Sequence, residues 1–276
     1  MILDEILLAK RLEVAERRTR LTISELKARI AGMPATRDFT GALRRSEQGE
    51  RRMALARGEA PGGKAPTPAL IAEIKAKSPS KGVILADFDP LYIARSYWLG
   101  GARCLSVLTD EQYFGGELER IALVKQAVEL PVLQKDFIVD PYQVYEARSI
   151  GADCILLIVA ALDEQELTDL YGLARELGLH VLVETHTRQE IVQAVVMGAE
   201  IIGINNRNLQ TFEVTLETTE ALASSVPAGR VLVGESGIFT RADAERLAEV
   251  GVDAILVGEA LMASGSIEEK TRELAG

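Results

Sequence analysis

Eight short apolar runs recur along this chain, and they constrain its fold more than any other feature. The runs end at Lys75, Asp110, Asp136, Val159, Glu184, Asn205, Glu235 and Glu259. Successive ends lie roughly 20 to 35 residues apart, and most gaps hold an amphipathic stretch with helical spacing. Apolar runs that alternate with helices are typical of a parallel sheet that is covered on both faces. Eight such units predict an α/β fold, a closed (β/α)8 TIM barrel with an N-terminal helical extension.

The length of 276 residues fits one barrel domain plus an extension, because barrels of this kind take about 250 residues. We expect a single domain over residues 1–276, in which residues 1–68 form the helical extension and a linker. Apolar residues at helical spacing between positions 2 and 14 predict a first helix. Thr22 and Glu25 form a capping-box pattern that predicts the start of a second helix. Three glycines and three prolines within residues 58–68 predict an irregular linker.

A group of arginines precedes this linker: Arg44, Arg45, Arg51, Arg52 and Arg57. They could form a docking patch for an acidic partner. Acidic residues are interspersed among them, however, and this pattern favours a solvated helix face. We therefore expect these side chains to be exposed.

Composition excludes several classes of protein. The net charge of −10 and the pI near 5.0 oppose nucleic-acid binding, and no apolar run is long enough to span a membrane. Acidic residues inside the first apolar stretch oppose a secretory signal. Cys104 and Cys154 begin two predicted strands, where we expect reduced thiols in the core of a cytoplasmic protein. His180 and His186 are the only histidines, so we expect no metal site.

Ionisable residues gather at the ends of the predicted strands, where barrel enzymes carry their active sites. Glu73 and Lys75 are two residues apart and therefore share one face of a strand. Later strands end at Lys135, Glu184, Asn205 and Glu235. These side chains could be structural ion pairs, but burying so many charges at separate strand ends is costly without a function. A lysine and a glutamate in a partly dry pocket suit general acid–base catalysis.

A second group of residues indicates an anionic ligand. Ser236 and Gly237 follow the seventh run, and Gly258 and Glu259 are the last two residues of the eighth. Loops at these two places commonly form a phosphate site from backbone N–H groups. Ser78, after the first run, adds a hydroxyl group, although a plain turn is the alternative. Because the chain is acidic overall, we expect Lys75, Lys77, Lys135 and Arg207 to supply a local positive field.

Aromatic residues flank the predicted mouth of the barrel. Tyr113 and Phe114 follow the second run, and Phe137 follows the third. They could provide stacking walls for a flat ring, with core packing as the alternative for each one alone.

Seven segments together resemble one family. They are IAEIKAKSPSKG, SVLTDEQYFGG, PVLQKDFIVDPYQ, LVETH, IGINNRNL, GESGI and ILVGEALM. In this order, from about Ala69 to Met262, they resemble indole-3-glycerol-phosphate synthase. The resemblance implies a carboxy-lyase of tryptophan biosynthesis that needs no cofactor or metal. Its substrate would be the phosphorylated, anthranilate-derived 1-(2-carboxyphenylamino)-1-deoxyribulose 5-phosphate, which loses CO₂ and water on ring closure.

The resemblance also implies roles for single residues. Lys135 is the expected general acid, and Glu184 is the expected acid or base in the dehydration. Glu73 and Lys75 would complete that relay, while Asn205, Arg207 and Glu235 would orient the substrate. Expected phosphate contacts are Ser78, Ser236, Gly237, Gly258 and Glu259, and expected walls around the ring are Phe114, Phe137 and Leu156.

The chain departs from the usual family pattern at several positions. It has KAKSPS, VETHT and GESGI, and Glu117 stands where a small hydroxyl residue is common. Two other interpretations stay open at this point. One is a sibling barrel such as phosphoribosylanthranilate isomerase, for which a Cys or Asp pair at the mouth would be more natural. The other is a barrel that binds a phosphorylated metabolite without converting it.

Overall fold

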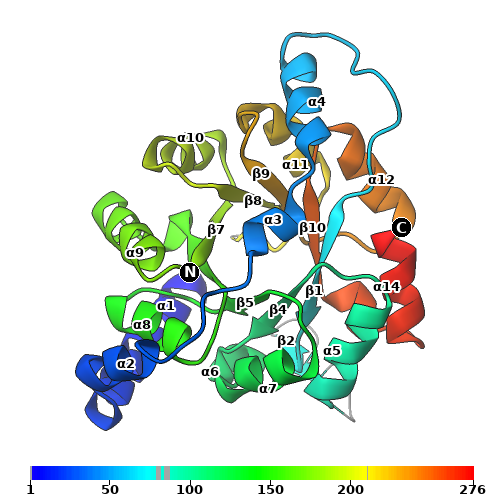
Figure 1. Cartoon of the computed structure of the whole chain (residues 1–276). Helices are drawn as coiled ribbons and strands as arrows, with labels where there is room; N and C mark the ends of the chain where they lie inside the picture. Colours follow the sequence, from blue (N-terminus) through cyan, green and yellow to red (C-terminus); the bar gives the residue numbers. More distant parts are fainter. Residues whose placement is uncertain (1, 79–81, 84–87, 210) are drawn as a thin grey trace.

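The computed structural model describes residues 2–78, 82–83, 88–209 and 211–276. Within them, eight parallel strands close into a barrel in the order β1-β10-β9-β8-β7-β6-β5-β4, which confirms the predicted fold (Figure 1). The strands are β1 (Ala69–Ile74), β4 (Cys104–Leu108), β5 (Val132–Lys135), β6 (Cys154–Ile158), β7 (His180–Thr185), β8 (Ile201–Asn205), β9 (Val231–Glu235) and β10 (Ala254–Val257). A small antiparallel pair, β2 (Lys77–Ser78) and β3 (Gly82–Val83), follows β1.

Helices surround the barrel, and the capping box predicted at Thr22 and Glu25 is present. After β1 they are α5 (Pro90–Leu99), α6 (Glu111–Phe114), α7 (Glu119–Ala127), α8 (Pro141–Ser149), α9 (Glu164–Glu176), α10 (Arg188–Met197), α11 (Glu217–Leu222), α12 (Arg241–Glu249), α13 (Glu259–Met262) and α14 (Ile267–Ala275), with short 3-10 turns η1 (Val159–Ala161) and η2 (Ala223–Ser225). Thr22 and Thr240 each cap a helix through a complete capping box. None of the described helices is long and apolar enough to cross a membrane.

Alternation along each strand decides which side chains reach the mouth. In β1, Leu70 and Ala72 pack outward against the helices, whereas Ala69 and Ile71 face the interior of the barrel. Glu73 has the same parity as Ile71 and is therefore the last inward residue of its strand. The same rule brings the final inward residues of the other strands to one end.

The N-terminal extension covers both ends of the barrel. It consists of α1 (Ile2–Arg20), α2 (Ile23–Ile30), α3 (Phe39–Leu43) and α4 (Ser46–Ala56). Phe39 and Leu43 are fully buried in one cluster with Cys104 and Cys154, so α3 closes the end where the strands begin (Figure 1). The two cysteines are free thiols in this core, as predicted. Helix α1 instead reaches the opposite end, where Leu3 and Ile6 line a cavity.

The expectation of a fully solvated arginine face is wrong for two of its members. Arg51 and Arg52 are buried and Arg45 is half-buried, whereas Arg44 and Arg57 are exposed. The Arg52 guanidinium pairs with Asp253 at 2.8 Å and donates to the backbone carbonyls of Val226, Gly251 and Arg230. These acceptors lie at the ends of other elements. The sequence pattern of α4 alone therefore could not predict that Arg52 is buried.

Candidate active site

A cavity of about 480 Å³ opens at the carboxyl ends of the strands. Every residue to which the family resemblance assigns a role lies on it except Ser78, whose side chain lies outside the described part of the chain. The residues brought together are Glu73, Lys75, Phe114, Lys135, Phe137, Leu156, Glu184, Asn205, Arg207, Glu235, Ser236, Gly237, Gly258 and Glu259. Tyr113 and Lys77 are absent from this lining, and Lys77 instead donates to the backbone oxygen of Gln112 at 3.0 Å.

Two lysines and three glutamates form an ionic cluster at the floor of the cavity. The Lys135 ammonium lies 3.6 Å from Glu184 Oε2 and 3.9 Å from Glu235 Oε2. At the carboxyl end of β1, Lys75 Nζ lies 2.8 Å from Glu73 Oε1. All three glutamates are buried, and their charges compensate those of the lysines. Both lysines line the cavity, where a ligand can reach them.

The charges of this cluster are strongly coupled. Burial lowers the pKa of Lys135, but the carboxylates of Glu184, Glu235 and Glu73 outweigh it, so the net pKa is raised and the side chain is an ammonium ion at neutral pH. Burial and the charge of Glu184 raise the pKa of Glu235 to about 8, although Lys135 opposes this. The pKa of Glu73 is lowered, because Lys75 and Lys135 overcome its burial.

Glu184 is held from two further sides. The amide of Asn205 donates to Glu184 Oε1 at 3.0 Å, and the ring nitrogen Nε2 of His186 lies 3.4 Å from the same oxygen. The other ring nitrogen of His186 lies 3.5 Å from Glu190. Burial lowers the pKa of His186, but a hydrogen bond with Glu190 and the charges of both carboxylates raise it overall. The sequence analysis missed this contact, although His186 stands only two residues after Glu184.

A tight turn after β9 forms another side of the cavity. Ser236 and Gly237 both adopt left-handed backbone conformations, with φ of 64° and 77°. Asn206 braces this turn: its side-chain amide donates to the Ser236 carbonyl at 3.1 Å, and its oxygen accepts from the Thr219 hydroxyl at 2.8 Å. A Cβ atom at Gly237 would lie 2.6 Å from Val214, so both conformation and space favour glycine there. Backbone N–H groups in such consecutive turns form concavities that bind anions.

The remaining wall is apolar. The rings of Phe114 and Phe137 have their centroids 6.3 Å apart with an interplanar angle of 36°. Leu156 extends this wall, and Leu3 and Ile6 reach it from α1. The sequence predicted α1 as a helix but not that it reaches the cavity, because helical spacing identifies an apolar face and not its partner.

Glycines make room for the carboxylates beneath the cavity. A Cβ atom at Gly203 would collide with Glu235 Oε1, and one at Gly258 would collide with Glu73 Oε1. Gly203 is an inward residue in the middle of β8, and Gly258 directly follows β10. The acidic floor therefore depends on small neighbours as well as on the acids themselves.

The comparisons with known proteins agree with this geometry. The family model described as indole-3-glycerol phosphate synthase matches residues 3–274 of the chain. Among solved structures, thiamine phosphate pyrophosphorylase from Pyrococcus furiosus superposes with a TM-score of 0.57 at 18% identity, over 75% of this chain and 93% of that chain. A mutant tryptophan synthase α-subunit from Pyrococcus furiosus gives a TM-score of 0.58 at 14% identity, over 76% and 98%. At these identities the structural matches establish the fold alone.

Proposed function

We propose a mechanism for the reaction in this cavity. Its premise is that this chain belongs to the indole-3-glycerol phosphate synthase family. The family consists of carboxy-lyases of tryptophan biosynthesis that act on a phosphorylated small molecule. The substrate we assign is 1-(2-carboxyphenylamino)-1-deoxyribulose 5-phosphate. One observation carries the assignment of the catalytic residues: the Lys135 ammonium stands between the buried carboxyl groups of Glu184 and Glu235, in a cavity with an apolar wall and an anion-binding turn.

The two ends of the substrate match two parts of the cavity. The benzene ring suits the wall of Phe114, Phe137 and Leu156, where burial of apolar surface favours binding. The phosphate suits the turn at Ser236 and Gly237, which offers backbone N–H groups. The ribulose carbonyl then lies between these ends, above the ionic cluster.

Ring closure needs a proton donor at the ribulose carbonyl. As the ring carbon that bears the carboxylate attacks this carbonyl, Lys135 donates a proton to its oxygen, and a carbon–carbon bond and a hydroxyl group form. The bond to the carboxylate then breaks, CO₂ leaves, and the electron pair restores the aromatic ring. The raised pKa of Lys135 means that the side chain begins the cycle protonated and so has a proton to give.

Dehydration completes the indole. The new hydroxyl group leaves as water after it takes up a proton, and the adjacent carbon loses a proton to form the double bond. Glu184, with Lys135 at 3.6 Å and Asn205 at 3.0 Å, is the acid–base group of this step. The Lys75–Glu73 pair at 2.8 Å provides a second donor and acceptor beside it.

The other polar residues orient the substrate. Asn205 fixes the carboxylate of Glu184 and accepts a hydrogen bond from the Arg207 backbone at 3.0 Å, which places Arg207 at the rim. Glu235, protonated at neutral pH, offers a hydrogen bond to the ribulose hydroxyl groups. Gly258 and Glu259 add backbone N–H groups near the phosphate.

Indole fluorescence tests this proposal directly. Purified protein mixed with the substrate in the presence of a chelator should develop indole emission, which also tests the prediction that no metal takes part. Lys135→Met should lower kcat by about 10²–10⁴-fold, the usual contribution of a general acid. Lys27→Met, on the exposed face of α2, is the control and should leave kcat unchanged. A Lys135→Met variant with near-normal kcat would refute the assignment of the acid.

A further inference from the structure

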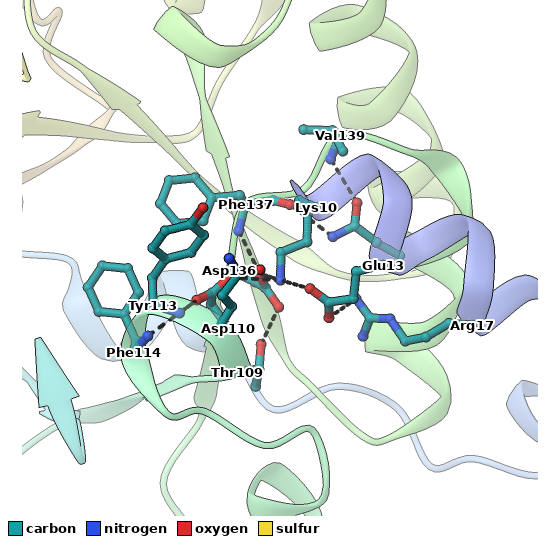
Figure 2. Close-up of polar contacts among 12 residues, drawn as sticks. Lys10, Glu13, Arg17, Thr109, Asp110, Tyr113, Phe114, Asp136, Phe137 and Val139 are labelled. Atoms are coloured by element: carbon teal, nitrogen blue, oxygen red, sulfur yellow. Dashed lines mark hydrogen bonds and ion pairs between the residues drawn. The ribbon is translucent and has the colours of Figure 1, made fainter. Parts of the chain in front are cut away.

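A buried lysine on the N-terminal extension joins α1 to the rim of the cavity. Lys10 is only 1% exposed, and its ammonium lies 2.8 Å from Glu13, 2.9 Å from Asp110 and 2.9 Å from Asp136 (Figure 2). Both aspartates are buried just beyond the ends of β4 and β5. Burial of a charge is costly unless it is paired. The ion pairs of Lys10 therefore hold α1 against the loops that follow β4 and β5.

Each of the two aspartates also holds an aromatic residue of the cavity wall. Asp110 caps α6 by accepting hydrogen bonds from the backbone N–H groups of Tyr113 at 2.8 Å and Phe114 at 3.3 Å. Asp136 accepts from the Phe137 backbone N–H at 2.8 Å (Figure 2). The positions of Phe114 and Phe137 therefore depend on carboxylates that share the Lys10 ammonium.

The same lysine fixes the wall on the side of α1. Leu3, Ile6 and Lys10 are spaced by three and four residues and so lie along one face of this helix. Leu3 and Ile6 line the cavity together with both phenylalanines. The Lys10 contacts thus fasten this helix face against the loops that carry the aromatic rings.

We propose that Lys10 is a positioning residue that sets the apolar compartment for the aromatic ring of the substrate. Its ion pairs are with Glu13, Asp110 and Asp136, which belong neither to the ionic cluster nor to the turn at Ser236 and Gly237 that follows β9. Without the ammonium, Asp110 and Asp136 are left as buried carboxylates near one another, and their repulsion moves the two rings and α1 apart. Recognition of the ring then weakens while recognition of the phosphate is kept. The inference rests on the proposed function, because that function supplies the ring.

The experiment compares a ligand with the ring and a ligand without it. Calorimetry measures the Kd of indole-3-glycerol phosphate and of glycerol 3-phosphate for the parent protein and for Lys10→Met. We expect roughly tenfold weaker binding of the ring-bearing ligand, the effect of a displaced aromatic contact, and less than about a twofold change for glycerol 3-phosphate. Arg11→Met is the matched control, since Arg11 is the next residue of α1 and pairs with Glu166 on α9.

A second variant tests the same role in case Lys10→Met does not fold. Asp110→Asn keeps an oxygen to cap α6 but removes the ion pair that fastens Lys10 of α1 to the loop carrying Phe114. It creates no repulsion between carboxylates, yet it loosens this link, so it should also weaken the ring-bearing ligand more than glycerol 3-phosphate. Equal changes for both ligands, or none in a folded variant, would overturn the role of Lys10. A parent protein that fails to bind indole-3-glycerol phosphate would instead overturn the proposed function.

Discussion

Replacement of Arg52 by methionine should destabilise the protein more than most single substitutions. The guanidinium is fully buried, pairs with Asp253 at 2.8 Å and donates to the Arg230 carbonyl at 2.7 Å. Methionine keeps most of the side-chain volume but supplies no donor. Removal of one partner of a buried ion pair costs about 3–5 kcal/mol. Asp253 still accepts a hydrogen bond from the Leu232 backbone N–H at 2.9 Å in the variant. The expected loss in the free energy of unfolding is therefore near the lower end of this range, at about 3 kcal/mol.

Thermal unfolding followed by circular dichroism measures this loss. For a chain of this size, 1 kcal/mol corresponds to a shift of about 2–4 °C, so Tm should fall by roughly 6–12 °C. Arg57→Met is the matched control at the exposed end of the same helix, where the arginine pairs with Glu59, and its Tm should be unchanged. An Arg52→Met protein that melts within about 2 °C of the parent would refute the reasoning about the buried pair.

Two further substitutions test the cavity. The pKa of Glu235 in the folded protein is about 8, above the value of 4.5 in the unfolded chain, so its contribution to stability is complete below pH 4.5 and is lost as the pH rises through 8. Glu235→Gln cannot titrate, and its Tm should fall less than that of the parent between pH 6 and 9, by on the order of 5 °C; parallel Tm curves would contradict the raised pKa. Ser236→Ala keeps the backbone N–H groups of the turn but removes the hydroxyl group, which we expect to donate a further hydrogen bond to the phosphate. KM should rise roughly tenfold with kcat unchanged, as expected for one lost hydrogen bond to a charged group, and steady-state kinetics showing a kcat loss at constant KM would contradict this role of the hydroxyl.

The barrel and the residues around its cavity could be predicted from the sequence, because both depend on local alternation. Once a strand is located, its inward residues follow from parity, and this placed Glu73, Lys135 and Glu235 together at one end. Strand ends were less accurate. The run ending at Asp110 extends past β4, which ends at Leu108, because Asp110 caps α6.

Contacts between distant segments could not be predicted. Arg52 and Lys10 lie in amphipathic helices whose own spacing is compatible with exposure or burial. Their partners, Asp253 for one and Asp110 and Asp136 for the other, are far away in the chain and lie near the ends of barrel strands. Only the folded arrangement shows that the extension contributes to both ends of the barrel.

The division of labour between Lys135 and Glu184 is tested most directly in a single turnover. Excess Lys135→Met or Glu184→Gln enzyme is mixed rapidly with substrate, and CO₂ release and indole emission are followed separately. Lys135→Met should lose both signals by about 10²–10⁴-fold, because ring closure precedes each. Glu184→Gln should release CO₂ near the parent rate while indole emission is slowed by a comparable factor. Parent-like indole emission from either variant, or equal loss of both signals in Glu184→Gln, would contradict the assigned roles.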